Sequence, residues 1–123
     1  MCFMPTILIA EDDQHLRVLL KQILELNNYC VIAVSDGQQA INYIKENPVD
    51  LLITDLIMPK KEGIETISEL KKTYHDLPIF AMSGGSLTST DIYLKIAKNL
   101  GVTKTFLKPF NVTEMLEAIK SVV

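Results

Sequence analysis

Cysteine is scarce in this chain of 123 residues, which contains only Cys2 and Cys30. Two cysteines cannot build a disulfide framework, and neither has the spacing of a metal-binding motif, so a reducing compartment suits both. A net charge of −3 leaves no basic stripe for direct binding to nucleic acid. No apolar run approaches the ~20 residues that a membrane span needs, and the first residues lack the basic region of a signal peptide. These absences predict a soluble cytoplasmic protein.

Apolar residues, in contrast, are abundant and are grouped in short runs. They make up 48% of the chain, which is enough for the core of one domain of ordinary size. Five runs are continuous rather than alternating, as in strands that are buried on both faces. The expected strands are 6–10, 29–34, 50–54, 79–82 and 104–107.

Helical periodicity separates these runs. Asp13 can cap a first helix, whose apolar stripe consists of Leu16, Leu19, Leu20, Ile23 and Leu24. Asp36 and Asn111 are expected to open the second and the last helix. The third helix is expected near 64–74 and the fourth near 89–100, where the residues predicted to face inward are Ile92, Ile96, Ala97 and Leu100. Strands that alternate with helices predict a parallel sheet with helices on both faces, and such sheets bind ligands at the carboxyl ends of their strands.

The chain places polar residues at these carboxyl ends. Glu11, Asp12 and Asp13 follow the first strand, Asp55 the third, Ser83 the fourth and Lys108 the fifth. Carboxylates that are gathered at one edge repel one another and raise each other's pKa unless a cation neutralises them. Mg²⁺ is suited to this role, because it takes carboxylate oxygens and favours phosphate. A lysine and a hydroxyl across the same site would complete a cradle for a transferred phosphoryl group. Asp13 is more simply explained as a helix cap.

Four sequence blocks carry a resemblance to a known family. They are ILIAEDD at 7–13, the pattern D-x-x-M-P-x-x-x-G at Asp55, Met58, Pro59 and Gly63, the pair Ser83-Gly84, and Lys108-Pro109-Phe110. With these blocks the chain resembles the receiver domains of two-component response regulators over essentially its whole length. The resemblance implies a single receiver domain over 1–123. It also implies a flavodoxin-like, doubly wound α/β fold, with a five-stranded parallel sheet in the order 2-1-3-4-5 and five helices.

The resemblance also implies a role for each site residue. Asp55 would be the phospho-acceptor, and Mg²⁺ would be held by Asp12 directly, by Glu11 through water, by Asp55 and by the backbone carbonyl of Ile57. Ser83 would hydrogen-bond the phosphoryl group and Lys108 would pair with it. The Lys108–Pro109 bond is a candidate for the cis form.

The family also implies particular partners. A sensor histidine kinase, a phosphotransfer protein or a small acyl phosphate would donate the phosphoryl group. An output protein would bind the face made by the fourth helix, fifth strand and fifth helix, and a homodimer is an option. The protein would catalyse only its own phosphorylation and slow dephosphorylation, without acting as an enzyme on other substrates.

The sequence departs from the family pattern at three places. Thr105 stands where members often carry the aromatic residue of the switch, and Phe106 beside it should point to the other face of the strand. The segment from Ser83 to Lys108 is about two or three residues longer than usual, so Gly84, Gly85, Ser86 and Thr88 are expected to form a loop. Ile57, two residues beyond Asp55, is apolar and is hypothesised to shield the acyl phosphate from water.

Three other functions can be compared with the residues that each would need. A serine hydrolase with Ser83 as nucleophile needs a later histidine, but His15 and His75 both precede it. A phosphatase that forms an aspartyl-phosphate needs a second acid near Asp55 to protonate the leaving group, and none follows. A receiver-like binding module that ignores phosphorylation remains the alternative, since Thr105 replaces the usual aromatic.

Overall fold

The fold alternates five strands with five helices along the chain. The computed structural model describes residues 4–56, 63–84 and 87–123. In order, the elements are β1 (Thr6–Ala10), α1 (Gln14–Leu26), β2 (Cys30–Val34), α2 (Gly37–Glu46), β3 (Leu51–Asp55), α3 (Gly63–Thr73), β4 (Ile79–Ser83), α4 (Leu87–Asn99), β5 (Lys104–Leu107) and α5 (Val112–Val122). Each expected strand and helix is present, with bounds that differ by a few residues.

The strands form one parallel sheet in the order β2-β1-β3-β4-β5. The predicted doubly wound topology is therefore confirmed. The register pairs Asp55 of β3 with Met82 of β4, and Ser83 of β4 with Leu107 of β5. Because these pairs lie at the carboxyl ends of the strands, Asp55, Ser83 and the following Lys108 meet at one edge.

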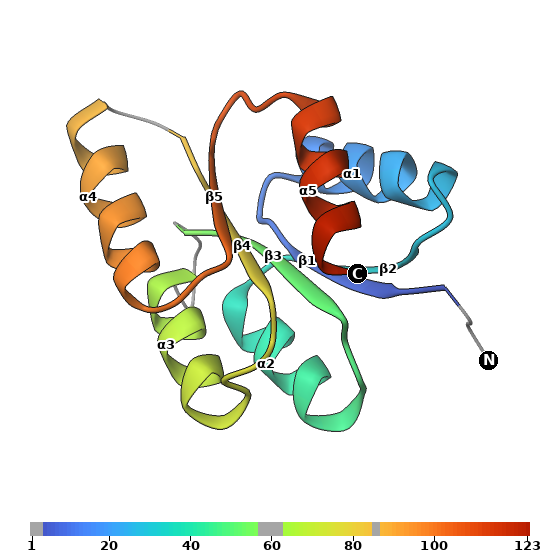
Figure 1. Cartoon of the computed structure of the whole chain (residues 1–123), viewed down its shortest axis with the longest axis horizontal. Coiled ribbons are helices and arrows are strands. Elements are labelled where there is room, and N and C mark those ends of the chain that lie inside the picture. The colour runs from blue at the N-terminus through green and yellow to red at the C-terminus, as the bar shows by residue number, and fades with distance from the viewer. Residues whose placement is uncertain (1–3, 57–62, 85–86) are drawn as a thin grey trace.

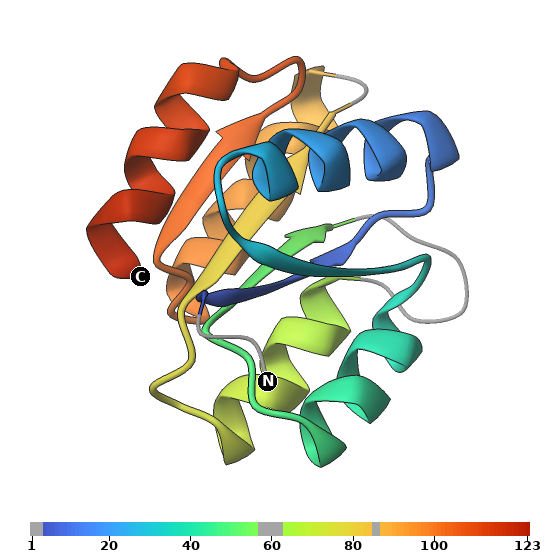
Figure 2. The same cartoon turned by 90° about the vertical axis from the view of Figure 1, so that its right-hand side faces the viewer.

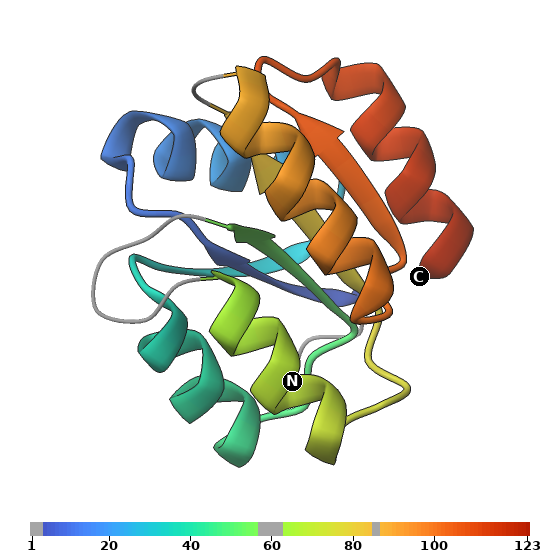
Figure 3. The ribbon, with the colours of Figure 1, turned by 90° about the vertical axis from the view of Figure 1, so that its left-hand side faces the viewer.

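Helices cover both faces of the sheet (Figure 1). Figure 2 shows α1 and α5 on one face and α2 and α3 on the other, and Figure 3 shows α4 running beside β5. One apolar core joins the sheet to α1 and α5, and the other joins it to α2, α3 and α4. Alternate residues of β1, β2, β3 and β4 serve the two cores, as Leu8 and Ile9 do in β1, whereas β5 adds Phe106 to the core of α1 and α5. Burial on both faces explains why the strands read as continuous apolar runs.

Side-chain caps fix where three helices begin. Asp13 accepts a hydrogen bond from the backbone N–H of His15 at the start of α1. Asp36 and Asn111 do the same for α2 and α5, each accepting from the N–H three residues ahead. The three predicted caps are confirmed.

Several apolar side chains expected to face inward are exposed instead. The exposed fraction is 51% for Leu19 in α1 and 59% for Ile92 in α4, and Ile96 is exposed as well. Thr88, expected in a loop, lies within α4. Within the described part of the chain, no helix combines the length and hydrophobicity needed to cross a bilayer.

Candidate functional site

Three carboxylates meet at the carboxyl edge of the sheet. Each of Glu11, Asp12 and Asp55 offers one oxygen, and these oxygens lie within 4.8 Å of one another. Glu11 is fully buried and Asp55 is buried, whereas Asp12 is exposed. An all-oxygen donor set that is open on one side fits a hard divalent cation such as Mg²⁺, which keeps several of its waters. Ile57, whose carbonyl was a further candidate ligand, lies outside the described residues.

Lys108 reaches the carboxylates from β5. Its Nζ lies 2.5 Å from Glu11 Oε1 and 3.4 Å from Asp55 Oδ2, and the side chain is 22% exposed. The Lys108 backbone N–H donates to the Ser83 carbonyl at 2.7 Å, which extends the pairing of β4 with β5 by one residue. The Lys108–Pro109 peptide bond is cis, as predicted. Lys108 is therefore a half-buried ion-pair partner rather than a freely solvated surface lysine.

Burial controls the protonation of these groups. It raises the pKa of Glu11 to about 7, against the opposing hydrogen bond from Lys108. Burial also raises the pKa of Asp55, although Lys108 lowers it in part. Burial lowers the pKa of Lys108, but the two carboxylates outweigh that effect and the pKa ends above its ordinary value. The cluster therefore retains a proton close to neutral pH, which a divalent cation would displace.

Ser83 ends β4 at the same edge of the sheet, and its hydroxyl is buried. The residue is fully buried, and its Oγ forms no hydrogen bond with any residue that the structure describes. A buried hydroxyl without a partner costs about 1–3 kcal/mol. Such an atom is suited to donate to a group that arrives later at the edge of the sheet.

Two glycines lie where a larger side chain would not fit beside the site residues. A Cβ atom at Gly84 would lie 2.9 Å from Lys108 Cβ, so a larger residue would push the lysine side chain aside. A Cβ atom at Gly63 would collide with the Asp55 carbonyl oxygen and lie 2.6 Å from Leu56 Cα. The Gly63 N–H donates to the Leu56 carbonyl at 2.9 Å, so the start of α3 rests directly on the end of β3. The last glycine of the D-x-x-M-P-x-x-x-G pattern is therefore required for close backbone packing.

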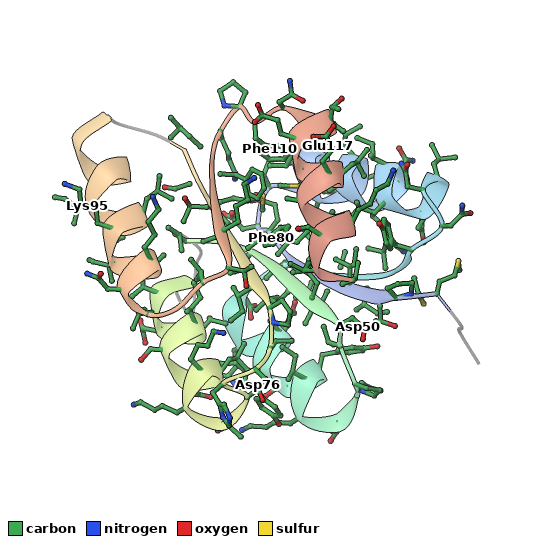
Figure 4. All side chains as sticks on the ribbon, viewed as in Figure 1. Asp50, Asp76, Phe80, Lys95, Phe110 and Glu117 are labelled. Atoms are coloured by element: carbon green, nitrogen blue, oxygen red, sulfur yellow. The ribbon has the colours of Figure 1, made fainter. Side chains whose placement is uncertain are left out.

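A groove leads from Asp55 along α1. It has a volume of about 830 Å³, and its apolar lining comes from α1 and from the segment that enters α5. Leu16, Leu19 and Phe110 are among these residues, and Asp55 and Lys108 lie at its polar end. In Figure 4, Phe110 lies near the start of α5, while Asp50 and Asp76 lie toward the opposite edge of the sheet. The exposure of Leu19 thus belongs to a groove that the sequence did not predict.

One contributor to the site was missed in the sequence. Arg17 of α1 donates from Nη1 to the carbonyl of Glu11 at 2.9 Å and to that of Asp12 at 3.4 Å. No motif marks an arginine at this place, and its only signal is that it lies one turn into a helix capped by Asp13.

The comparisons with known proteins agree with this geometry. The sequence model of the family described as "Response regulator receiver domain" matches residues 7–120. The chain belongs to this family. The receiver is 39% identical to the response regulator GtcR of Aneurinibacillus migulanus over 116 residues, which are 94% of this chain and 46% of GtcR. It is 34% identical to the transcriptional regulatory protein CpxR of Escherichia coli (strain K12) over 119 residues, which are 97% of this chain and 49% of CpxR. The receiver thus spans about half the length of these curated relatives.

Solved structures show the same fold. The chemotaxis response regulator CheY4 of Vibrio cholerae superposes with a TM-score of 0.86 at 24% identity, covering 98% of this chain and 99% of CheY4. The response regulator protein TrrA of Thermotoga maritima, solved in complex with Mg²⁺–BeF, superposes with a TM-score of 0.83 at 27% identity and covers 98% of this receiver and 100% of TrrA.

Proposed function

We propose that the receiver accepts a phosphoryl group on Asp55 and thereby switches a protein-contact surface. The observation that carries this proposal is the position of Asp55, whose Oδ2 lies 3.4 Å from the Lys108 ammonium in a cluster with Glu11 and Asp12. Its other oxygen, Oδ1, accepts from the Leu56 N–H at 2.9 Å, which fixes the carboxylate. A fixed carboxylate beside a cation is a suitable nucleophile for phosphorus.

The chemistry needs few parts. An Asp55 oxygen attacks phosphorus while the bond from phosphorus to the donor breaks, and the electron pair of that bond leaves with the donor, as acetate or imidazole. Glu11, Asp12 and Asp55 would hold Mg²⁺, which would offset the charge that develops on the phosphoryl oxygens. Lys108 supplies a point charge to the same oxygens, and Ser83 donates its hydroxyl to one of them. The receiver acts in this way on itself alone and not as an enzyme on other substrates.

The partners follow from the family. The donor is a sensor histidine kinase, a phosphotransfer protein or a small acyl phosphate in the cytoplasm, and it reaches Asp55 through the groove along α1. The output protein binds the face formed by α4, β5 and α5, where Ile92, Ile96 and Leu107 are exposed apolar side chains. A second copy of the receiver is another candidate for this face. Residues 1–123 act as one receiver unit.

A mass measurement tests the proposal directly. The chain is incubated with acetyl phosphate and Mg²⁺, and the intact mass is compared with and without EDTA. We expect a Mg²⁺-dependent gain of one phosphoryl group that is lost in Asp55→Asn. Asp76→Asn is the matched control, because it removes one exposed carboxylate far from the site and should keep the gain.

The alternative function is a receiver-like module that binds its partner without phosphorylation. It is favoured by Thr105, which pairs with Ala81 on the α2, α3 and α4 face of the sheet, whereas Phe106 belongs to the opposite core. No aromatic side chain of β5 therefore faces α4. Wild-type protein that gains no mass under the conditions above would support this alternative.

A further inference from the structure

One residue of α1 donates hydrogen bonds along the whole turn that carries the acidic pair. The Arg17 guanidinium donates from Nη1 to the carbonyl oxygens of Glu11 and Asp12, at 2.9 and 3.4 Å. The Arg17 backbone N–H donates to the third carbonyl of the turn, that of Asp13, at 2.9 Å. All three consecutive carbonyl oxygens of the turn therefore accept hydrogen bonds from Arg17, whose side chain is half-buried.

The remaining contacts of this turn leave Asp12 dependent on Arg17. Glu11 is anchored on both sides, because its N–H donates to the Val34 carbonyl at 3.1 Å and its Oε2 accepts from the Asp13 N–H at 3.1 Å. Asp12 is exposed, and among the described residues its peptide is held by the hydrogen bond that its carbonyl accepts from Arg17. Arg17 therefore supplies the hydrogen bond that restrains the peptide from which the Asp12 carboxylate leaves.

We propose that Arg17 is a positioning residue for the divalent cation. By fixing the peptide planes of Glu11 and Asp12, it holds their carboxylates within reach of Asp55 before the ion arrives. The inference rests on the proposed function, since it assumes that this cluster takes Mg²⁺. Both hydrogen bonds come from Nη1, whose two N–H groups are held in the plane of the guanidinium. The rotating ammonium of lysine, on a shorter stem, does not hold its donors in these fixed directions. Residues that orient metal ligands in this way typically account for about 10–100-fold in metal affinity.

The test separates positioning from charge and from folding. Arg17→Met and Arg17→Lys are compared with Lys21→Met, which removes one positive charge from the next turn of the same helix. The dissociation constant for Mg²⁺ is measured by isothermal titration calorimetry. The Mg²⁺ concentration that half-saturates phosphorylation by acetyl phosphate is measured in parallel. Circular dichroism during heating shows that each variant is folded at the temperature of the titration.

We expect Arg17→Met to weaken Mg²⁺ binding about 10-fold and to raise the half-saturating Mg²⁺ concentration by the same factor. Arg17→Lys should recover less than half of this loss of Mg²⁺ affinity, measured on the logarithm of the dissociation constant. The dissociation constant of Lys21→Met should stay within about twofold of the wild-type value. A folded Arg17→Lys that binds Mg²⁺ as tightly as wild type would overturn the inference, because charge alone would then suffice. Equal losses of Mg²⁺ affinity in Arg17→Met and Lys21→Met would also overturn the inference. If wild type itself binds no Mg²⁺, the inference and the proposed metal site both fail, whereas normal wild-type binding with an unaffected Arg17→Met overturns the inference alone.

Discussion

The buried hydroxyl of Ser83 leads to an unusual prediction about the stability of the receiver. Replacing a buried serine normally weakens a protein, because its hydroxyl has a hydrogen-bond partner that is then lost. Ser83 Oγ forms no hydrogen bond with the residues that the structure describes, so Ser83→Ala should make the unphosphorylated receiver more stable. Alanine fills nearly the same volume, so no sizeable cavity offsets the gain.

The magnitude follows from the cost of leaving a buried hydroxyl unpaired. That cost is about 1–3 kcal/mol, and we expect the free energy of unfolding to rise by about 1 kcal/mol, at the low end of the range. For a domain of this length, such a change shifts the melting temperature by about 4 °C. Urea unfolding followed by circular dichroism measures it as a higher midpoint with an unchanged slope.

Thr54→Val is the matched control for Ser83→Ala. Thr54 is also fully buried at the end of a strand, but its hydroxyl donates to the Asp55 carbonyl at 2.9 Å. This variant should lose about 1 kcal/mol, so the two deletions of a buried hydroxyl should change stability in opposite directions. If Ser83→Ala is destabilised to the same extent as Thr54→Val, its hydroxyl has a partner in the resting state and the reasoning is wrong.

The function of the hydroxyl is tested with the same variant. Beryllofluoride with Mg²⁺ imitates a phosphoryl group on a carboxylate, and wild type should gain stability on adding both. Ser83→Ala should gain less, because one donor to the bound anion is missing. Equal gains in wild type and Ser83→Ala would remove Ser83 from the proposed site, while leaving Asp55 as the acceptor.

Two further predictions concern pH and backbone packing. The pKa of Glu11 is raised from 4.5 to about 7, so between these pH values the folded state binds more protons than the unfolded state. Without Mg²⁺, the free energy of unfolding should therefore fall as the pH rises from 4.5 through 7. The affinity for Mg²⁺ should rise over the upper part of the same pH range. Urea unfolding of wild type and Glu11→Gln at several pH values checks this, and an equal slope in both would show that Glu11 is not the group responsible. Gly63→Ala should destabilise the fold by about 3 kcal/mol, because its Cβ would meet the backbone of Asp55 and Leu56. Thermal melting measures this effect, and a loss below about 1 kcal/mol would mean that α3 can shift away from β3 at little cost.

The parallel sheet was accessible from the sequence because its inner strands are buried on both faces, whereas its strand order came from the resemblance to the receiver family. Continuous apolar runs such as 6–10 mark such strands, and the crossover rule then brings their carboxyl ends to one edge. The proximity of Glu11, Asp55 and Lys108 follows from that placement alone. What the sequence could not supply were atomic contacts, such as the missing partner of Ser83 Oγ or the carbonyls that Arg17 binds.

The wrong predictions of inward-facing side chains share one physical cause. Periodicity identifies the apolar side of a helix, but it does not show how much of that side the sheet covers. Leu19 lies on the apolar side of α1 and yet faces a groove, and Ile92 of α4 is exposed near the edge strand β5. Apolar residues that are left uncovered in this way mark candidate contact surfaces rather than errors in the helix assignment.

The ion pair between Glu11 and Lys108 joins residues that are 97 positions apart. One partner follows the first strand and the other follows the last, so the site exists only when β5 has docked at the edge of the sheet. A chain that is still being synthesised, or one cut before β5, has its acidic residues but lacks the cation that offsets their burial. Under the proposed function, a chain in which β5 has not docked lacks the Lys108 charge beside Asp55 and should not accept a phosphoryl group.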